Sequence, residues 1–271
     1  MNQYNPLKFF QPTLLESLPD EEKIVVVDPD ENTDGAPEDL LDELEYADAI
    51  LNGGSKDVTP DESLAVVESI KERYPGKPVY EEPGDKSHVT IDTVRKHDGL
   101  LASVPLNGDL QTTVSQHLEF LDEAEQKVKE KFPDFLPENR FTDGLADTAV
   151  DYLVNTKYFP QAFVIMNPDC DAAEKAGVNP TDIPDKETIG NYASMIDEKS
   201  TVPILYIEYS GEYGDPEIVE AASQRLNDTH LRYGGGIETH DQIDEMLEAG
   251  ADSVVVGTSI EDGLNPFNPD Y

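Results

Sequence analysis

The chain has 271 residues and a formal net charge of −39, from 58 acidic and 19 basic side chains. A negative excess of this size repels nucleic-acid phosphates and anionic lipid surfaces, so it excludes nucleic acid as a partner. No apolar run approaches the roughly 18 residues needed to span a bilayer, so we expect any membrane contact to be peripheral. With 37% apolar residues, the chain can bury the core of one large α/β domain.

Short β-branched runs alternate with helical patterns along the chain. The strands are predicted at 23–28, 48–54, 77–82, 99–104, 161–167, 202–209, 229–234 and 252–257. The helices are predicted at 37–46, from Thr59 onward, and at 187–198, 215–227 and 239–249. This alternation implies parallel pairing with right-handed crossovers, and eight such units predict a TIM (β/α)₈ barrel. A doubly wound open sheet is the alternative, but no glycine fingerprint follows the first strand.

Three regions depart from a regular barrel. Residues 83–98 are short and polar, a poor place for a full helix. Residues 118–160 hold a charged helix and a polar stretch with prolines, which predicts an elaborated fourth helix or a surface insertion. We treat 1–271 as a single barrel domain in which 1–20 are an N-terminal extension. Only SIEDGLNPFNPDY follows the last strand, too little for a full eighth helix, so we expect the barrel to close by dimerisation or by the N-terminal segment.

The acidic residues are spread along helix faces instead of being massed in one tail. This pattern favours a halophilic protein kept soluble by concentrated salt, where screening removes self-repulsion. A solvating acidic protein or a nucleic-acid mimic is the alternative. The one cysteine, Cys170, excludes a disulfide framework and favours a reducing, cytoplasmic location.

Glycines gather after the seventh and eighth predicted strands. Gly234, Gly235 and Gly236 follow the seventh, and Gly257 and Thr258 follow the eighth. In a TIM barrel these two loops commonly bind phosphate through backbone N–H groups. A tight turn also explains one glycine run, but two such loops in consecutive units favour a phosphate site.

Polar side chains end three other strands. Glu208 ends the sixth strand, where barrel active sites lie, so it can act as a base or orient a hydroxyl; a structural carboxylate is the alternative. Asp28 ends the first strand and Ser55 the second. A carboxylate and a hydroxyl make a sparse Mg²⁺ site that relies on water and on phosphate oxygens of the substrate. The alternative for Asp28 is a turn residue beside Pro29.

The motifs DPD, NGGS–VT, MNPDC, YIEYSG–YGDPE, YGGGI and VVVGT, in this order, resemble those of archaeal geranylgeranylglyceryl phosphate synthases and their bacterial heptaprenylglyceryl phosphate relatives. The resemblance is specific over 161–262 and weaker but collinear over 23–117. It implies a modified TIM barrel with an irregular segment in place of the third helix, and a dimer or larger assembly. It also implies transfer of a polyprenyl group from its diphosphate to the 3-hydroxyl of sn-glycerol 1-phosphate, with Mg²⁺.

The resemblance implies roles for individual residues. Asp28 and Ser55 match the Mg²⁺ ligands, and Glu208 would take or orient the hydroxyl proton. The segment that holds glycerol phosphate is matched by Tyr206, Ile207, Glu208, Tyr209, Ser210 and Gly211. The phosphate cradle is matched by Gly235, Gly236, Gly257 and Thr258.

The first strand departs from the family pattern at two basic positions. Val26 replaces a lysine that is expected to touch phosphate, and Glu31 replaces a second basic residue. Lys56 or Arg232 can compensate for this loss. A diverged paralogue that binds another phosphorylated ligand, with lost or altered catalysis, is therefore the alternative function. Another phosphate-handling barrel enzyme is a third, but no strand ends in a lysine suited to an aldolase.

Overall fold

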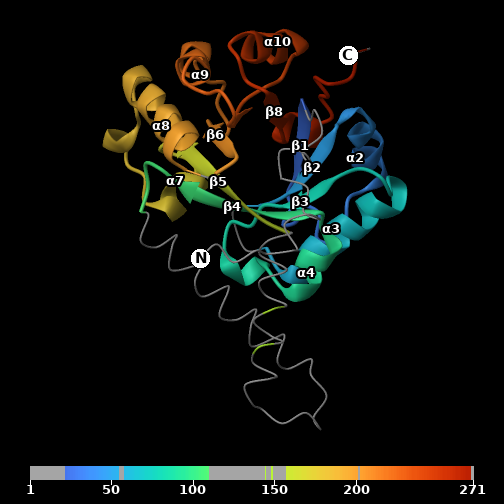
Figure 1. The fold of residues 1–271 in the computed structure, drawn as a ribbon. Helices are drawn as coiled ribbons and strands as arrows, with labels where there is room; N and C mark the ends of the chain where they lie inside the picture. Colours follow the sequence, from blue (N-terminus) through green and yellow to red (C-terminus); the bar gives the residue numbers. More distant parts are fainter. Residues whose placement is uncertain are drawn as a thin grey trace.

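The computed structural model describes residues 22–54, 58–109, 144, 148, 157–200 and 202–269. Eight parallel strands form a closed barrel in the order β1 to β8 (Figure 1). The strands are β1 Lys23–Val27, β2 Ala49–Asn52, β3 Val79–Glu81, β4 Gly99–Pro105, β5 Tyr158–Ile165, β6 Ile204–Glu208, β7 His230–Gly234 and β8 Ser253–Val256. The TIM-barrel prediction is confirmed, and all eight predicted strands are present.

Helices lie outside this ring of strands (Figure 1). The α-helices are α2 Glu38–Glu43, α3 Pro60–Arg73, α4 Ile91–Lys96, α7 Asp171–Ala176, α8 Lys186–Lys199, α9 Pro216–Ser223, α10 His240–Glu248 and α11 Thr258–Glu261. The 3₁₀ helices are η2 Leu44–Tyr46, η3 Lys86–His88 and η4 Pro180–Asp182. Thr59 and Thr239 each open a helix with a capping box, in which the threonine and the third helical residue satisfy each other's backbone N–H.

The segment between β3 and β4 lacks a full-length helix, as its polar sequence predicts. It contains η3 and the six-residue α4, which Thr90 caps and which ends where His97 adopts an extended backbone. β5 begins at Tyr158, inside the segment 118–160 that we predicted to be an insertion. Most of that segment and the extension 1–20 lie outside the described residues.

The barrel closes within one chain, so the predicted closure by dimerisation or by the N-terminal segment is wrong. β1 pairs with β8 directly, with Ile24 opposite Val255. The C-terminal residues replace most of an eighth helix: α11 has four residues, and Asn265 then donates hydrogen bonds to the backbone and the carboxylate of Glu43. Phe267 is buried at 2% exposure.

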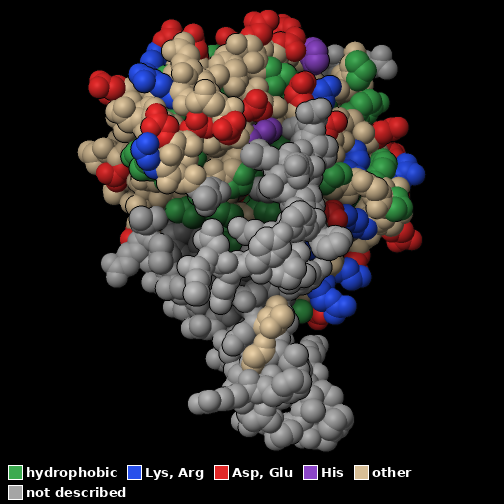
Figure 2. All heavy atoms as spheres, viewed as in Figure 1, with side chains coloured by type: hydrophobic (Ala, Val, Ile, Leu, Met, Phe, Trp, Pro, Cys, Tyr) green, Lys and Arg blue, Asp and Glu red, His purple; other side chains and the backbone are tan. Residues whose placement is uncertain are grey.

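Alternation along the strands divides the core into two layers. Inward-facing side chains fill the barrel, among them Ile24, Leu51, Tyr80, Tyr206 and Val255. Outward-facing side chains pack against the helices, among them Val25, Ile50, Val79, Leu205 and Ile207. No helix in the described part of the chain is both long and apolar enough to cross a membrane. Acidic side chains are spread over the described part of the face in Figure 2, with fewer lysines and arginines between them.

Candidate active site

A cavity of about 650 Å³ opens where the carboxyl ends of the strands meet. All eight strands or the loops after them contribute to its lining. Most site residues predicted from the sequence line it: Asp28, Tyr206, Glu208, Ser210, Gly211, Gly235, Gly236, Gly257 and Thr258. The fold therefore brings together residues that lie up to 230 positions apart, from Asp28 to Thr258.

Glu208 stands at the end of β6 with one carboxylate oxygen already engaged. Its Oε1 accepts hydrogen bonds from the backbone N–H of Ser210 at 3.0 Å and from the Ser210 hydroxyl at 2.5 Å. Asn167 fixes this turn by donating to the Ser210 carbonyl at 2.8 Å. Burial raises the pKa of Glu208, and the hydrogen bonds from Ser210 and Tyr206 oppose that rise. The carboxylate is thus rigidly oriented and more basic than an exposed glutamate.

The glycines after β7 allow two loops to approach each other closely. Gly235 and Gly236 have φ values of +138° and +56°, which other residues rarely adopt. A Cβ at Gly236 would lie 2.2 Å from the backbone nitrogen of Tyr213. Ser259, after β8, donates to the carbonyl of Ile237 at 2.5 Å and so joins the loops that follow β7 and β8. The three consecutive glycines therefore let the neighbouring loops pack closely and leave bare backbone lining the cavity.

Asp28 lies against the backbone that follows β2. A Cβ at Gly54 would lie 2.2 Å from the Asp28 Oδ1 atom, and that oxygen accepts the Asp30 N–H at 2.9 Å. Burial raises the pKa of Asp28, as do the nearby charges of Glu31 and Asp30. Ser55, the second predicted Mg²⁺ ligand, lies outside the described residues.

Two predicted site residues do not line the cavity. Ile207 points outward into the helix layer and is fully buried there, because adjacent residues of a strand face opposite sides. Tyr209 packs its ring on Tyr233, with 6.0 Å between ring centroids, and against Gly214. The structure gives both side chains packing roles, and binding of glycerol phosphate by the segment to which they belong stays a prediction.

The basic residues near the cavity differ from those we expected. Val26 lines the cavity, so the family lysine is missing from the lining. Arg232 is fully buried within the barrel and bonds to Gln161, so it does not line the cavity in place of that lysine. Lys56 lies outside the described residues. Instead Lys175 of α7 lines the cavity, close enough to Asp28 that its charge opposes the rise of the Asp28 pKa.

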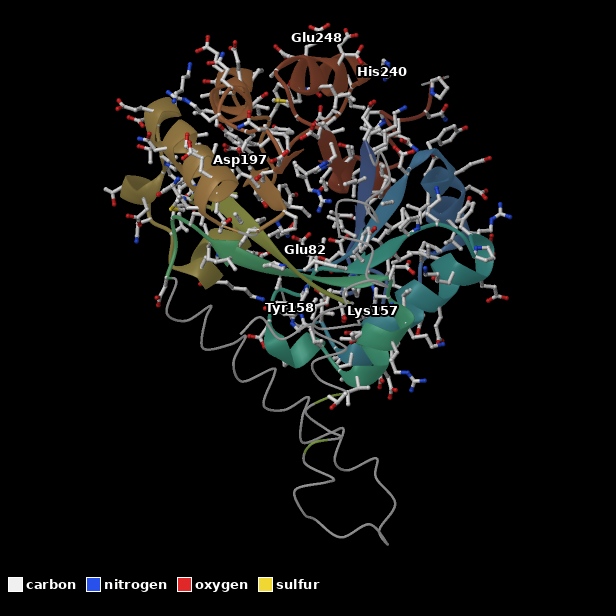
Figure 3. All side chains as sticks on the ribbon, viewed as in Figure 1. Glu82, Lys157, Tyr158, Asp197, His240 and Glu248 are labelled. Carbon is white, nitrogen blue, oxygen red and sulfur yellow. The ribbon has the colours of Figure 1, made fainter. Side chains whose placement is uncertain are left out.

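Sequence reasoning also missed Glu82, which lies inside the ring of strands (Figure 3). Its Oε1 accepts hydrogen bonds from the Ser103 hydroxyl at 3.2 Å and from the Gln161 amide. Burial raises the pKa of Glu82 to about 7, while the charge of Arg232 opposes that rise. The available signal was the pair Glu81–Glu82 at the end of an apolar strand, where one of two adjacent acids must face inward.

The side of the cavity formed by β3 to β5 is mostly apolar. Its lining includes Val89, Leu100, Ala102, Pro105, Tyr158, Phe163 and Ile165. Phe163 meets Tyr206 edge-to-face, with 5.1 Å between ring centroids. We call this surface the apolar wall. It faces the opposite side from the glycines of β7 and β8, so one cavity offers a polar end and a hydrocarbon-like side.

The chain is similar in sequence to several known proteins. The PcrB family matches residues 142–267 of the chain. The geranylgeranylglyceryl phosphate synthase of Halobacterium salinarum is 30% identical over 245 residues, covering 90% of this chain and 89% of that protein. The heptaprenylglyceryl phosphate synthase of Geobacillus kaustophilus is 43% identical over 104 residues, 38% of this chain and 42% of that protein.

A solved structure shares the fold. The (S)-3-O-geranylgeranylglyceryl phosphate synthase from Thermoplasma acidophilum, determined in complex with its substrate sn-glycerol-1-phosphate, superposes with a TM-score of 0.68. The sequence identity is 21%, and the match covers 95% of each chain.

Proposed function

Because this chain belongs to the geranylgeranylglyceryl phosphate synthase family, we propose that it transfers a polyprenyl group from an allylic diphosphate to the 3-hydroxyl of sn-glycerol 1-phosphate. The observation that carries the proposal is Glu208, held in a fixed orientation between a glycine-lined end and the apolar wall of one cavity. The two ends match the two parts of the reaction, a small phosphorylated alcohol and a long hydrocarbon.

The glycerol phosphate would bind at the glycine-lined end. Gly235, Gly236 and Gly257 expose backbone to the cavity, and Thr258 adds a hydroxyl. Neutral donors suit an anion in a chain that carries few cations, because backbone N–H groups bind phosphate without a compensating charge. With the phosphate there, the glycerol reaches toward β6 and Glu208.

Glu208 would accept the proton of the attacking hydroxyl. Its raised pKa makes the carboxylate a stronger base, and the hydrogen bonds from Ser210 orient it toward the substrate. Holding the hydroxyl next to the allylic carbon removes the entropy cost of bringing two substrates together.

The residues around Asp28 fit a magnesium ion that is bound mainly through its substrate. Asp28, Glu31 and Glu261 crowd negative charge at the ends of β1 and β8, and their carboxylates are the hard oxygen ligands that Mg²⁺ prefers. Within the described residues, no group of three or more acidic, histidine or cysteine side chains is arranged to hold a metal. When bound, Mg²⁺ would neutralise the diphosphate oxygens and so ease departure of the diphosphate.

The apolar wall would hold the prenyl chain. Its aliphatic and aromatic side chains exclude water from the reacting carbon, which protects an allylic cation from hydrolysis. Lys175, at the mouth of the cavity near Asp28, would meet the diphosphate.

The decisive experiment combines radiolabelled sn-glycerol 1-phosphate, Mg²⁺ and polyprenyl diphosphates of several lengths, and extracts the labelled ether lipid. We expect product from the wild type, with a loss of roughly a hundredfold or more for Glu208→Gln. The assay is run in both molar salt and dilute buffer, because the net charge of −39 predicts that the fold needs screening.

The control variant Glu187→Gln removes an exposed carboxylate in the first turn of α8, away from the cavity, and should keep full activity. A folded wild type that yields no ether lipid under any of these conditions would contradict the proposal. That result would favour a diverged paralogue, which Val26 in the cavity lining already makes a specific alternative.

A further inference from the structure

Glu82 lies where the polar part of the cavity meets the apolar wall. It directly follows β3, and its backbone N–H donates to the carbonyl of Asn52 at 3.0 Å, which holds it in line with the sheet. A Cβ at Gly53 would lie 2.6 Å from the Glu82 carbonyl, so the ends of β2 and β3 are tightly packed. Its inward-facing neighbours are Ser103 on β4 and Gln161 on β5. Phe163, two residues beyond Gln161 on the same face of β5, lines the cavity as part of the apolar wall.

Hydrogen bonds from two side chains hold one carboxylate oxygen of Glu82 in place. Ser103 and Gln161 both donate to Oε1, and Gln161 also donates to the Ser103 hydroxyl at 2.8 Å. Arg232 in turn donates to the Gln161 Oε1 at 3.4 Å. Within the described residues Oε2 has no hydrogen-bond partner, although the side chain lines the cavity. Four strands therefore support a carboxylate with one oxygen available to a ligand.

This arrangement costs stability, which argues for a function. Gln161 and Arg232 are fully buried, and the Arg232 Nε has no hydrogen-bond partner among the described residues. Apolar side chains of similar volume would usually fill such an interior at lower cost. The charged groups that face Glu82 are Arg232, which favours its ionised form, and Glu208, which opposes it.

We infer that the free oxygen of Glu82 stabilises the positive charge that develops on the allylic carbons of the prenyl donor. The inference rests on the proposed function. As the C1–O bond breaks, its electron pair leaves with the diphosphate and the allyl group becomes positive. The glycerol oxygen then bonds to C1, and its proton passes to Glu208. Glu82 forms no bond and takes no proton.

The position of Glu82 favours this role over substrate binding. A prenyl chain is uncharged in the ground state, so a carboxylate beside the apolar wall gains an opposite charge only in the transition state. Interactions of this kind raise the rate without tightening substrate binding. Glu208 does not fill the same role, because in this scheme it takes the proton of the attacking hydroxyl and thereby loses its negative charge.

The test compares Glu82→Gln with Glu81→Gln, the neighbouring acid that points away from the cavity. For Glu82→Gln we expect kcat to fall about tenfold to a hundredfold, while KM for both substrates changes less than about threefold. Glu82→Asp, which keeps the charge, should recover part of the rate. Glu81→Gln should match the wild type.

A binding measurement separates this role from a structural one. We would compare two prenyl analogues, one with an ammonium nitrogen in place of an allylic carbon and one neutral. Glu82→Gln should weaken the ammonium analogue about tenfold and leave the neutral one unchanged. Equal changes for both analogues, or no change in kcat, would overturn the inference while leaving the proposed function intact. Absence of product from the wild type would instead sink the proposed function.

If Glu82→Gln does not fold, the role of Glu82 can be tested with the wild type alone. Because burial raises the pKa of Glu82 to about 7, its carboxylate form becomes dominant above that pH. The preference for the ammonium over the neutral analogue should therefore grow as pH rises from about 6 to 8. A preference that stays flat over this range would contradict the role of Glu82.

Discussion

Glu81 and Glu82 are adjacent acids at the end of one strand, yet they belong to different regions of the molecule. Glu82 faces the cavity, whereas Glu81 faces outward and is 2% exposed beneath α3 and α4. Strand alternation alone separates them. We refer to the two surroundings as the inner network, formed by Glu82, Ser103, Gln161 and Arg232, and the outer network, formed by Glu81, Asn52, Ser63, Thr93 and His97.

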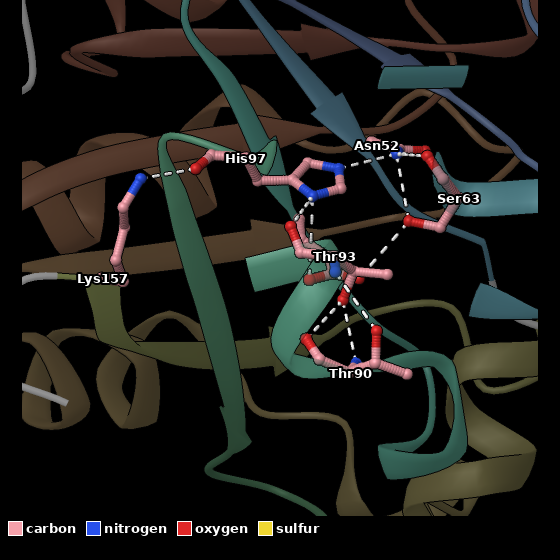
Figure 4. Close-up of polar contacts among 7 residues, drawn as sticks. Asn52, Ser63, Thr90, Thr93, His97 and Lys157 are labelled. Atoms are coloured by element: carbon pink, nitrogen blue, oxygen red, sulfur yellow. Dashed lines mark hydrogen bonds and ion pairs between the residues drawn. The ribbon is translucent and has the colours of Figure 1, made fainter. Parts of the chain in front are cut away.

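Figure 4 shows the hydrogen bonds that join Asn52, Ser63, Thr93 and His97 in the outer network. Asn52 donates to the Ser63 carbonyl and to His97 Nε2, both at 2.8 Å, and His97 Nδ1 bonds to the Thr93 carbonyl at 2.8 Å. A carbonyl only accepts, so Nδ1 carries the proton and the ring is neutral. Burial lowers the pKa of His97 to about 4 and raises that of Glu81 to about 8, so both are uncharged near pH 7.

The difference between the networks shows that the end of one strand can contribute both to stability and to the cavity. The outer network presents no free oxygen to the cavity. Its hydrogen bonds stabilise the ends of β2 and β3 on the helix-facing side of the sheet. The inner network presents to the cavity the carboxyl group of Glu82, which becomes mostly ionised above a pH of about 7, its pKa. Changes to the outer network should therefore alter stability, and changes inside the cavity should alter activity.

Asn52→Ala, a change in the outer network, should give the largest effect, which is a loss of stability. It leaves the His97 Nε2 acceptor unpaired in a buried site, which we expect to lower the free energy of unfolding by about 3 kcal/mol. The kcat/KM of the folded protein should stay within about twofold of the wild type. Urea unfolding and steady-state assays measure the two quantities.

The control Asn227→Ala removes an exposed asparagine that bonds to Asp197, and it should lower the free energy of unfolding by less than about 1 kcal/mol. Lost activity at unchanged stability would break the distinction between the networks.

Gly236→Ala should come next, on the cavity side. The new Cβ would lie 2.2 Å from the Tyr213 nitrogen at a φ of +56°, so the loop after β7 must move. We expect kcat/KM to fall about a hundredfold, or about 2.7 kcal/mol, mostly through KM for glycerol phosphate. Gly263→Ala is the matched control, because Gly263 has a φ of +78° and no atom within 4 Å of the added Cβ. It carries the backbone strain without the crowding, and so should keep full activity. Equal losses in both variants would show that the close packing of Gly236 is irrelevant.

Glu81→Gln should change how stability depends on pH. A raised folded-state pKa means that stability falls as pH rises from the ordinary value of 4.5 to about 8. The lowered pKa of His97 has the opposite effect between about 4 and 6.5, so of these two groups only Glu81 still contributes above pH 6.5. The variant should therefore gain on the order of 2 kcal/mol over the wild type between pH 6.5 and 8. Unfolding midpoints at the two pH values measure this gain, and parallel curves for the two proteins would mean that Glu81 is not neutral in the fold.

The two networks also show which parts of the fold and of the site could be predicted from the sequence. Strand positions followed from apolar runs, and the glycine-lined end from glycines after consecutive strands. Glu82 was missed because the direction of a side chain depends on the residue at which each strand ends. For the same reason the sequence did not show that the Ile207 side chain faces outward, although Ile207 lies between two residues that line the cavity. Lys175 was missed because α7, a six-residue helix capped by Cys170, is too short to give a periodic pattern.

Lys175→Met should give the smallest effect and tests the one lysine in the described lining. We expect KM for the prenyl diphosphate to rise about tenfold, or about 1.4 kcal/mol, since an exposed lysine forms a partly screened contact. KM for glycerol phosphate and the unfolding midpoint should not change, and Lys175→Arg should keep most of the affinity. The control Lys186→Met removes a lysine of α8 that pairs with Asp215 and Glu217, outside the cavity lining. A rise in KM for glycerol phosphate instead would place the Lys175 charge at the glycine-lined end. It would then stand in for the lysine that Val26 replaces, so a charge lost from β1 would have been restored by a helix that follows β5.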